Sequence, residues 1–416
     1  MNIMKKALLI ILGILVAIGL ICLAFFVANE HHVEAMNKYI DSFGRVEIEN
    51  QLKPQLDEDG RYYFTTDGDF KVMQLTDVHI GGGAMSAKKD RQAINAVAAM
   101  IKAEKPDLVV VTGDISFAVP WSGTINNSYA HEYFKRLMEN LGVYWTVTFG
   151  NHDSEIYNYH NRAAVAKMYS DEGLEYCLFS SEDGGVYGEC NHVINVKNSA
   201  GLITKSLIMM DSNSYTKQDP LGIRWLYDNI HEDQIKWYRD TVTELNEYNT
   251  RLIDSLPKEE RPENPEKFTT VQSLLFIHIP LTEVRAAYEA YLSAGEKDTE
   301  EVIYGGGSVG EDEPYVFCSK DEDEMFETML ELGSTKAVFY GHDHMNNIVL
   351  TYRGITLSYG YSIDYFAYAG IDKIGSQRGC TVISCHSDTD FDITHENYYQ
   401  DKFHPLYEKE NVELTN

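Results

Sequence analysis

The hydrophobic and polar positions divide the chain into one long apolar run near its start and a series of shorter runs after it. Residues 7–28 form the long run, and Lys5 and Lys6 precede it. As a helix this run would extend roughly 33 Å at about 1.5 Å per residue, which is enough to cross a bilayer. We therefore predict a transmembrane signal anchor at residues 7–28. Residues 1–6 form a cytoplasmic N-terminus, because positive charge stays on the cytoplasmic side.

A cleaved secretory signal is the alternative reading of this run. The apolar region of such a signal is usually only about 7–15 residues long, so we favour the uncleaved anchor. In both cases the residues after the run face outside. The expectation is a single-pass protein of the cell membrane with an extracellular domain, or a secreted protein if the N-terminal segment is cleaved.

After the anchor, short apolar runs typical of strands alternate with amphipathic segments of helical period. The predicted strands are 70–75, 108–111, 143–149, 207–210, 274–277 and 337–340, and the predicted helices are 88–105, 131–141, 232–247 and 322–332. Continuous apolar runs are typical of parallel strands buried on both faces and joined by right-handed crossovers. The fold class is therefore α/β.

The remaining segments define the predicted domain organisation. Residues 29–68 are expected to form a polar spacer and a first hairpin, with a turn at Asp67 and Gly68 that joins residues 61–65 to 70–75. Residues 69–400 form one domain, with surface insertions at 254–267 and 296–313 and added strands at 348–350, 355–357 and 380–383. Residues 401–416 are a C-terminal tail.

Five of the predicted strands end in residues that bind metals. These residues are Asp77 and His79, then Asp114, then Asn151 and His152, then His278, and finally His342 and His344. Ligand sites in open α/β sheets lie at the carboxyl ends of the strands, so we expect these side chains to converge. Residues two apart on an extended segment point the same way, which would pair Asp77 with His79 and His342 with His344.

The mixture of nitrogen and oxygen donors favours transition metals such as Fe, Mn or Zn over Ca²⁺, which prefers oxygen ligands. Seven ligands exceed the needs of one ion, whereas two ions bridged by a carboxylate account for them. Asp114, alone at its strand end, is the expected bridge. His152 is then a spare imidazole that we expect to act on substrate, and Asp153 either orients it or caps a turn.

Two nearby segments each have two readings. Tyr157, Tyr159, His160 and Arg162 either line the mouth of the site or begin an amphipathic helix. Asp211 follows the run 207–210 and either supports the site or ends the strand in a turn.

Charge and cysteine content narrow the functional classes. The formal net charge of −29 argues against affinity for nucleic acid or for anionic membrane surfaces, since both need clustered Lys and Arg. Five cysteines lie outside the anchor; they are either buried free thiols, which we favour, or include a disulfide between Cys177 and Cys190.

The ordered motifs Asp-x-His, Gly-Asp, Gly-Asn-His-Asp, His and Gly-His-x-His resemble those of the calcineurin-like metallophosphoesterase superfamily. The resemblance implies a four-layer αββα sandwich, here preceded by one N-terminal transmembrane helix, with a dinuclear metal centre. It assigns one ion to Asp77, His79, Asp114 and His344, and the other to Asp114, Asn151, His278 and His342. It also implies that His152 lies near the scissile phosphate.

Within that superfamily, the segments around His278 and His342 are similar to the branch related to purple acid phosphatases. Phe117 stands where a true purple acid phosphatase has its iron-binding Tyr, and His79 supplies a histidine instead. The resemblance therefore does not imply a purple tyrosinate-to-iron colour, and it leaves the metals open among Fe, Mn and Zn.

The expected function is that of an exported, membrane-anchored phosphoesterase with two divalent or trivalent transition metal ions. We expect it to hydrolyse phosphomonoesters by attack of a metal-bridging hydroxide. A phosphodiesterase acting on nucleotides, phospholipid headgroups or wall polymers is the main alternative, and a non-catalytic metal-binding ectodomain is a further one. The expected partners are a phosphate-ester substrate and the membrane, and the oligomeric state stays open.

Overall fold

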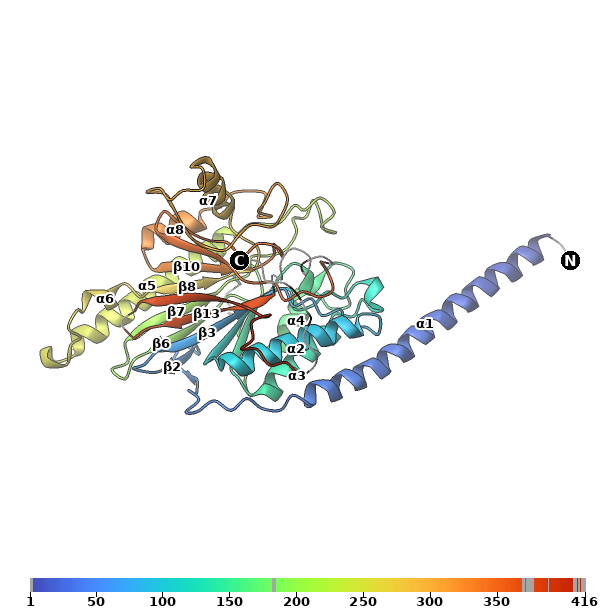
Figure 1. Cartoon of the computed structure of the whole chain (residues 1–416), viewed down its shortest axis with the longest axis horizontal. Coiled ribbons are helices and arrows are strands. Elements are labelled where there is room, and N and C mark those ends of the chain that lie inside the picture. Colours follow the sequence, from blue (N-terminus) through green and yellow to red (C-terminus); the bar gives the residue numbers. More distant parts are fainter. Residues whose placement is uncertain are drawn as a thin grey trace.

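The computed structural model describes residues 3–181, 185–368, 371, 378–387, 389–406, 410 and 412. Parts of the predicted N-terminal segment 1–6 and of the predicted tail 401–416 lie outside these residues. A long helix, α1 (Ile3–Asp41), extends from a body in which two sheets are packed between helices (Figure 1). This arrangement confirms the predicted α/β class with its four layers and one N-terminal helix.

The larger sheet has nine strands in the order β1-β2-β6-β7-β8-β10-β12-β11-β9. Its strands are β1 (Gln55–Leu56), β2 (Tyr62–Thr65), β6 (His192–Lys197), β7 (Ile203–Met209), β8 (Ser273–Phe276), β9 (Val302–Gly306), β10 (Thr335–Tyr340), β11 (Val349–Tyr352) and β12 (Ile355–Tyr359). The smaller sheet has the order β14-β13-β3-β4-β5. It contains β3 (Phe70–Leu75), β4 (Leu108–Thr112), β5 (Trp145–Thr148), β13 (Gly379–Cys385) and β14 (Phe391–Asn397).

Helices cover the outer face of each sheet (Figure 1). The smaller sheet carries α2 (Ala87–Glu104), α3 (Ser128–Leu141) and α4 (Arg162–Tyr169) on its side of the molecule. The larger sheet carries α5 (Glu232–Ser255), α6 (Glu266–Thr269), α7 (Thr282–Ser293) and α8 (Met325–Leu332). Short 3₁₀ turns interrupt the loops, among them η1 (Pro120–Ser122), η2 (His152–Ser154) and η3 (Lys258–Glu260).

The central strands are apolar throughout because both of their faces are buried. On β8, Leu274 and Phe276 belong to the core between the two sheets, whereas Leu275 packs with the helices outside. On β10, Phe339 faces the inner core and Val338 the outer one. Successive side chains on a strand point to opposite faces, so continuous apolar runs are required in the middle of such a sandwich.

Helix α1 extends beyond the predicted anchor. It continues to Asp41, where the sequence indicated a polar spacer from residue 29. Met36 and Ile40 are buried in the core cluster that α1 shares with α2 and α3, and Val33 packs against it. These residues have the spacing of one helical face, which the polar average composition of residues 29–41 hides. The described part of the chain contains one helix that is long and apolar enough to cross a membrane.

The predicted hairpin around Asp67 and Gly68 is wrong. Strand β2 pairs in parallel with β6 in the larger sheet, and β3 pairs with β4 and β13 in the smaller one. The turn therefore crosses from one layer to the other, and the rings of Phe64 and Phe70 meet between the sheets at 4.9 Å. An apolar contact across the core thus outweighs the local turn signal.

Two other segments differ from the expectations, whereas the favoured reading of the cysteines is confirmed. The surface insertion 296–313 contains an edge strand, β9, which pairs with β11. The cysteines that the structure describes are free thiols, and those outside α1 are buried, which removes the disulfide alternative. Strand β6 was not expected, because His192, Asn195 and Lys197 interrupt its apolar residues.

Candidate metal centre

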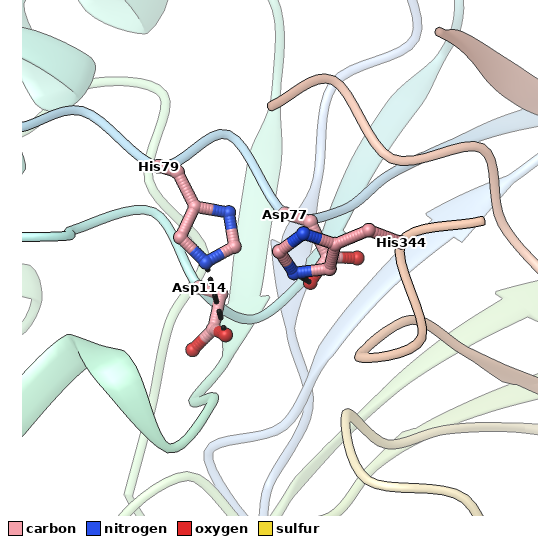
Figure 2. A group of neighbouring side chains, drawn as sticks. All are labelled: Asp77, His79, Asp114 and His344. Carbon is pink, nitrogen blue, oxygen red and sulfur yellow. Dashed lines mark ion pairs between the residues drawn. The ribbon is translucent and has the colours of Figure 1, made fainter. Parts of the chain in front are cut away.

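The carboxyl ends of β3, β4 and β5 in one sheet meet those of β8 and β10 in the other. This edge gathers a first cluster of four buried side chains, Asp77, His79, Asp114 and His344, whose candidate ligand atoms lie within 4.8 Å of one another. Figure 2 shows His79 pointing at Asp114 and His344 at Asp77. The His79 Nε2 to Asp114 Oδ2 distance is 3.4 Å, and the His344 Nε2 to Asp77 Oδ1 distance is 3.5 Å.

A second cluster consists of Asp114, His278 and His342, again with ligand atoms within 4.8 Å of one another. His278 Nε2 lies 3.2 Å from the same Asp114 Oδ2 that faces His79. Asp114 therefore belongs to both clusters, which is the arrangement that a bridging carboxylate requires.

The backbone at these residues is not extended, contrary to the expectation for the Asp77 and His79 pair and the His342 and His344 pair. Asp77, His79 and Asp114 have φ values of 51°, 51° and 53°, and His342 has 78°. Non-glycine residues rarely adopt this left-handed region, and such residues concentrate at functional sites. Main-chain hydrogen bonds from Asp77 N to Gly113 O and from His79 N to Asp114 O hold the turns. A sharp turn thus orients the side chains of these four residues.

Several nitrogen and oxygen atoms that could bind a metal at this edge are buried and lack a hydrogen-bond partner among the described residues. They are Nδ1 and Nε2 of His79, Oδ2 of Asp114, Oδ1 of Asn151 and Nε2 of His278. Buried polar atoms are normally paired, so this concentration indicates a missing ligand. Imidazole nitrogens mixed with carboxylate and amide oxygens suit a borderline transition metal, so the residues fit the implied ions.

Asn151 stands next to the second cluster with its amide oriented. Its Nδ2 donates to the hydroxyl of Tyr215 at 2.8 Å, which leaves Oδ1 without a partner. A metal can bind only the amide oxygen, so Tyr215 fixes the orientation that a ligand needs. Tyr215 was not expected from the sequence, because it lies far from the motifs.

Outer contacts orient two of the histidines. His278 Nδ1 lies 2.8 Å from the carbonyl of Thr112, so the imidazole offers Nε2 to Asp114. His344 Nδ1 lies 3.3 Å from Oδ2 of Asp364, a buried carboxylate that also accepts the main-chain N–H of Phe366 at 2.6 Å. Such second contacts fix the tautomer and raise ligand basicity. Asp364 was missed because it belongs to none of the motifs.

Electrostatics at the edge favour bound positive charge. Burial lowers the pKa of His79, but Asp364, Asp114 and Asp77 outweigh burial and raise it to about 10. Burial acts likewise on His278, whose pKa Asp114 raises to about 9. Burial raises the pKa of Asp114, yet His278 and His152 hold it well below its usual range. The buried carboxylates thus attract cations strongly.

His152 lies at the wall of the site and is oriented by Glu155. The His152 Nδ1 to Glu155 Oε1 distance is 2.7 Å. Asp153, expected either to orient His152 or to cap a turn, accepts main-chain N–H groups from Asp114, Ser116 and Gly150 at 2.8–3.0 Å. Its carboxylate therefore ties the β4 and β5 loops together, and the orienting contact comes from Glu155. The only feature of the sequence that could have indicated Glu155 is its position three residues after His152.

A buried ion pair supports the loop that carries Asn151. Arg162 Nε donates to Asp211 Oδ2 at 2.8 Å, and its Nη1 donates to the carbonyl of Gly150 at 2.8 Å. Ser212 Oγ accepts the main-chain N–H groups of His278 and Ile279. Arg162 is therefore the first residue of α4, and its side chain holds the Asn151 loop through Gly150 O. Asp211 is the ion-pair partner of Arg162.

The clusters open into a pocket of about 280 Å³. Its lining residues are Asp114, His152, Trp225, Tyr227, Glu311, Phe317, His342, Asp343, His344 and Tyr368. Asp343 accepts the hydroxyl of Tyr359 and the main-chain N–H of Phe317, so its carboxylate is bound away from the clusters. The pocket joins the candidate metal ligands, His152 and an aromatic wall in one cavity.

Comparison with known proteins identifies the family. The model of the calcineurin-like phosphoesterases matches residues 70–346, and the chain belongs to this family. The family, and the relatives below, confirm the resemblance stated from the motifs.

The chain is 27% identical over 340 residues to the "Probable inactive purple acid phosphatase 14" of Arabidopsis thaliana, covering 77% of this chain and 76% of the relative. It is 27% identical over 316 residues to "Phosphatase DCR2" of Saccharomyces cerevisiae, covering 71% of this chain and 48% of that protein. A solved dimetal phosphatase from Danio rerio aligns with a TM-score of 0.46 at 10% identity, covering 80% of this chain and 97% of that one.

Proposed function

We propose that this protein is a metal-dependent phosphatase with two transition metal ions, one at each cluster. The observation that carries the proposal is the set of buried, unpartnered nitrogen and oxygen atoms around Asp114. The names of some plant relatives contain the words "probable inactive". The proposal for this chain depends on its own donors, which include both carboxylates, the oriented amide and four imidazoles.

Asp77, His79, Asp114 and His344 would hold one ion, and Asp114, Asn151, His278 and His342 the other. When bound, such a pair of ions activates water and neutralises the charge on the phosphoryl oxygens. His152 acts from the pocket wall, where its free Nε2 can donate a proton to the departing alkoxide. Glu155 supports that role, because its contact with Nδ1 orients the ring.

Pocket size supports a monoester substrate over a diester. The cavity of about 280 Å³ is slightly smaller than the roughly 300–1,000 Å³ typical of ligand sites. Such a cavity accommodates one phosphoryl group and a small part of the leaving group. A diester would place a second ester group against Trp225 and Phe317, which form an edge-to-face pair at 5.7 Å on the wall.

We also propose that α1 anchors the protein in the cell membrane and that the catalytic domain, residues 69–400, lies outside the cell. The apolar stretch of α1 is fully exposed, which a membrane would relieve. Lys5 and Lys6 before it support a cytoplasmic N-terminus. Protease accessibility of the domain on intact cells tests this orientation.

Metal content and turnover of p-nitrophenyl phosphate in the wild type and in His152→Ala test the catalytic proposal. We expect the variant to keep both ions and to lose about 10²- to 10⁴-fold in kcat, the usual worth of a general acid. Unchanged turnover would remove His152 from the mechanism. A wild type that binds two ions but hydrolyses neither p-nitrophenyl phosphate nor its bis ester would contradict catalysis itself, and faster hydrolysis of the bis ester would contradict the monoester assignment.

A further inference from the structure

Large apolar side chains are exposed together on three loops beside the metal centre. Met85, Trp121, Ile125, Ile156 and Tyr159 are 61%, 60%, 39%, 64% and 76% exposed, respectively, and we call them the loop surface. The loops are in contact: Met85 N donates to Ser122 O, and Tyr159 N donates to Ile125 O. Contiguous exposed apolar side chains on a soluble body mark an interaction surface.

The loop surface lies against the end of the apolar part of α1. A cavity of about 800 Å³ at this junction is lined by Cys22, Phe25 and Phe26 of α1 and by Pro120, Ile125 and Tyr159 of the loops, among others. Beyond this point α1 runs away from the body of the protein (Figure 1). The side chains of the loop surface are therefore neighbours of the residues at which the candidate span ends.

Polar contacts fix α1 relative to these loops. The Asn29 side chain, which is buried, donates to Gly123 O and accepts from Ala84 N, both at 2.9 Å. One residue thus ties α1 to two of the three loops. Farther along, Met36 and Ile40 are fully buried in the core. The candidate span and the docked segment form one continuous helix, so the span cannot cross a membrane without bringing the loop surface close to it.

Charge on the three loops differs from that of the rest of the chain. The protein carries 64 Asp and Glu residues, yet residues 80–89, 116–128 and 154–161 contain only Glu155. Glu155 is buried beside His152 and does not face outward. Lys88 and Lys89 lie in the first turn of α2, directly after the first loop. The three loops therefore present no exposed carboxylate that would repel the phosphate groups of lipid headgroups.

The loop surface also connects to the metal centre. The ring of Trp121 packs on Phe117 at 6.2 Å, and Phe117 packs on His152 at 4.9 Å and on His79 at 5.4 Å. Through Phe117, the exposed Trp121 is therefore one ring away from the histidine assigned to the substrate.

We propose that the outer leaflet of the bilayer covers the loop surface, so that the catalytic domain rests on the membrane and the metal centre is held at the lipid headgroups. Trp and Tyr are the side chains favoured at this interface, and Met and Ile enter the acyl boundary. The phosphomonoesters that reach the pocket most readily are then those carried by membrane lipids. This inference rests on the anchoring part of the proposed function.

Fluorescence of the full-length protein in nanodiscs tests the contact. Phospholipids brominated on their acyl chains quench tryptophans that touch the lipid. We expect Trp121→Phe to remove most of the bromolipid quenching and the matched variant Trp225→Phe to retain it, because Trp225 is similarly exposed at 63% but lines the pocket. Equal quenching in the wild type and in Trp121→Phe overturns the proposal, as does a chain that does not insert into nanodiscs.

A second variant tests the surface without altering Trp121. Replacing Ile156 and Tyr159 by Asp places charge at two exposed positions that the fold does not need, so metal content is retained. We expect reduced bromolipid quenching of Trp121. Full quenching would contradict the proposal that the membrane covers the loop surface. Turnover of p-nitrophenyl phosphate in the same nanodiscs separates the two proposals, because turnover without quenching removes only the surface and quenching without turnover removes only the catalytic function.

Discussion

The two candidate metal positions differ in the types of ligand that surround them. The first cluster has two carboxylates, Asp77 and Asp114, with Asp364 behind His344, and its members are buried. The second shares Asp114 but adds two imidazoles and the neutral amide of Asn151, and His342 is partly exposed to the pocket. The first position therefore concentrates negative charge away from solvent. The second position has fewer carboxylates and is open to the pocket. We infer that the first ion is held more tightly and that the second is the one that exchanges with solution.

Removing the shared carboxylate has the largest expected effect. Asp114→Asn weakens both positions, and turnover should fall by more than about 10³-fold, because each bound ion supplies several kcal/mol of charge stabilisation. Elemental analysis should show loss of both ions. Asp343→Asn is the matched control: this carboxylate lies between two candidate ligands but is bound to Tyr359, so its loss should leave two ions in place. Equal metal loss in both variants would mean that Asp114 has no bridging role.

Removing one imidazole should separate the two positions. His278→Ala affects only the second cluster, so we expect one ion per chain and a fall in turnover of roughly 100-fold, in line with the loss of a single ion's charge stabilisation. Metal titration followed by calorimetry counts the remaining site. Two retained ions, or none, would remove the distinction between the clusters.

The sequence predicts the ligand positions because metal chemistry requires particular side chains at strand ends. Asp77, Asp114 and His278 could be expected to converge, since parallel strands direct their carboxyl ends to one edge. What could not be predicted is how they are aimed. The left-handed backbone at Asp77 and His342 depends on contacts between loops that lie far apart in the chain.

Supporting residues were harder to predict than ligands. Asp364 contacts His344 from the segment after β12, and Tyr215 contacts Asn151 from another loop, so neither has a fixed spacing from its partner. The hairpin at Asp67 failed for a related reason: the turn is local, but the choice of sheet for β2 and β3 is decided by packing in the core. Propensity alone does not contain that information.

A smaller effect should follow from removing the carboxylate behind the first cluster. Asp364→Asn leaves every candidate ligand in place but weakens the orientation of His344. Loss of such an outer partner typically costs about 10–100-fold in metal affinity. We expect the dissociation constant of the tighter ion to rise by that amount while the weaker one is unchanged, as measured by competition with a chromophoric chelator. A change confined to the weaker ion would reverse the assignment of the clusters.

The smallest expected effect on the centre concerns the ion pair between Arg162 and Asp211. This pair supports the loop of Asn151, a candidate ligand of the second cluster only. Burial raises the pKa of Asp211, but Arg162 outweighs it and holds the pKa below its usual range. The folded carboxyl is therefore the stronger acid, so its stabilisation is complete above the unfolded pKa of about 3.9 and is lost as pH falls through the folded value.

Asp211→Asn should remove this acid dependence and cost about 3–5 kcal/mol of stability, the usual result of breaking a buried pair. Turnover at neutral pH should change only a few-fold, because Arg162 still donates to Gly150 O. Denaturant unfolding at pH 3 to 7 measures the stability of both proteins, and parallel curves would show that the pair does not control the acid response.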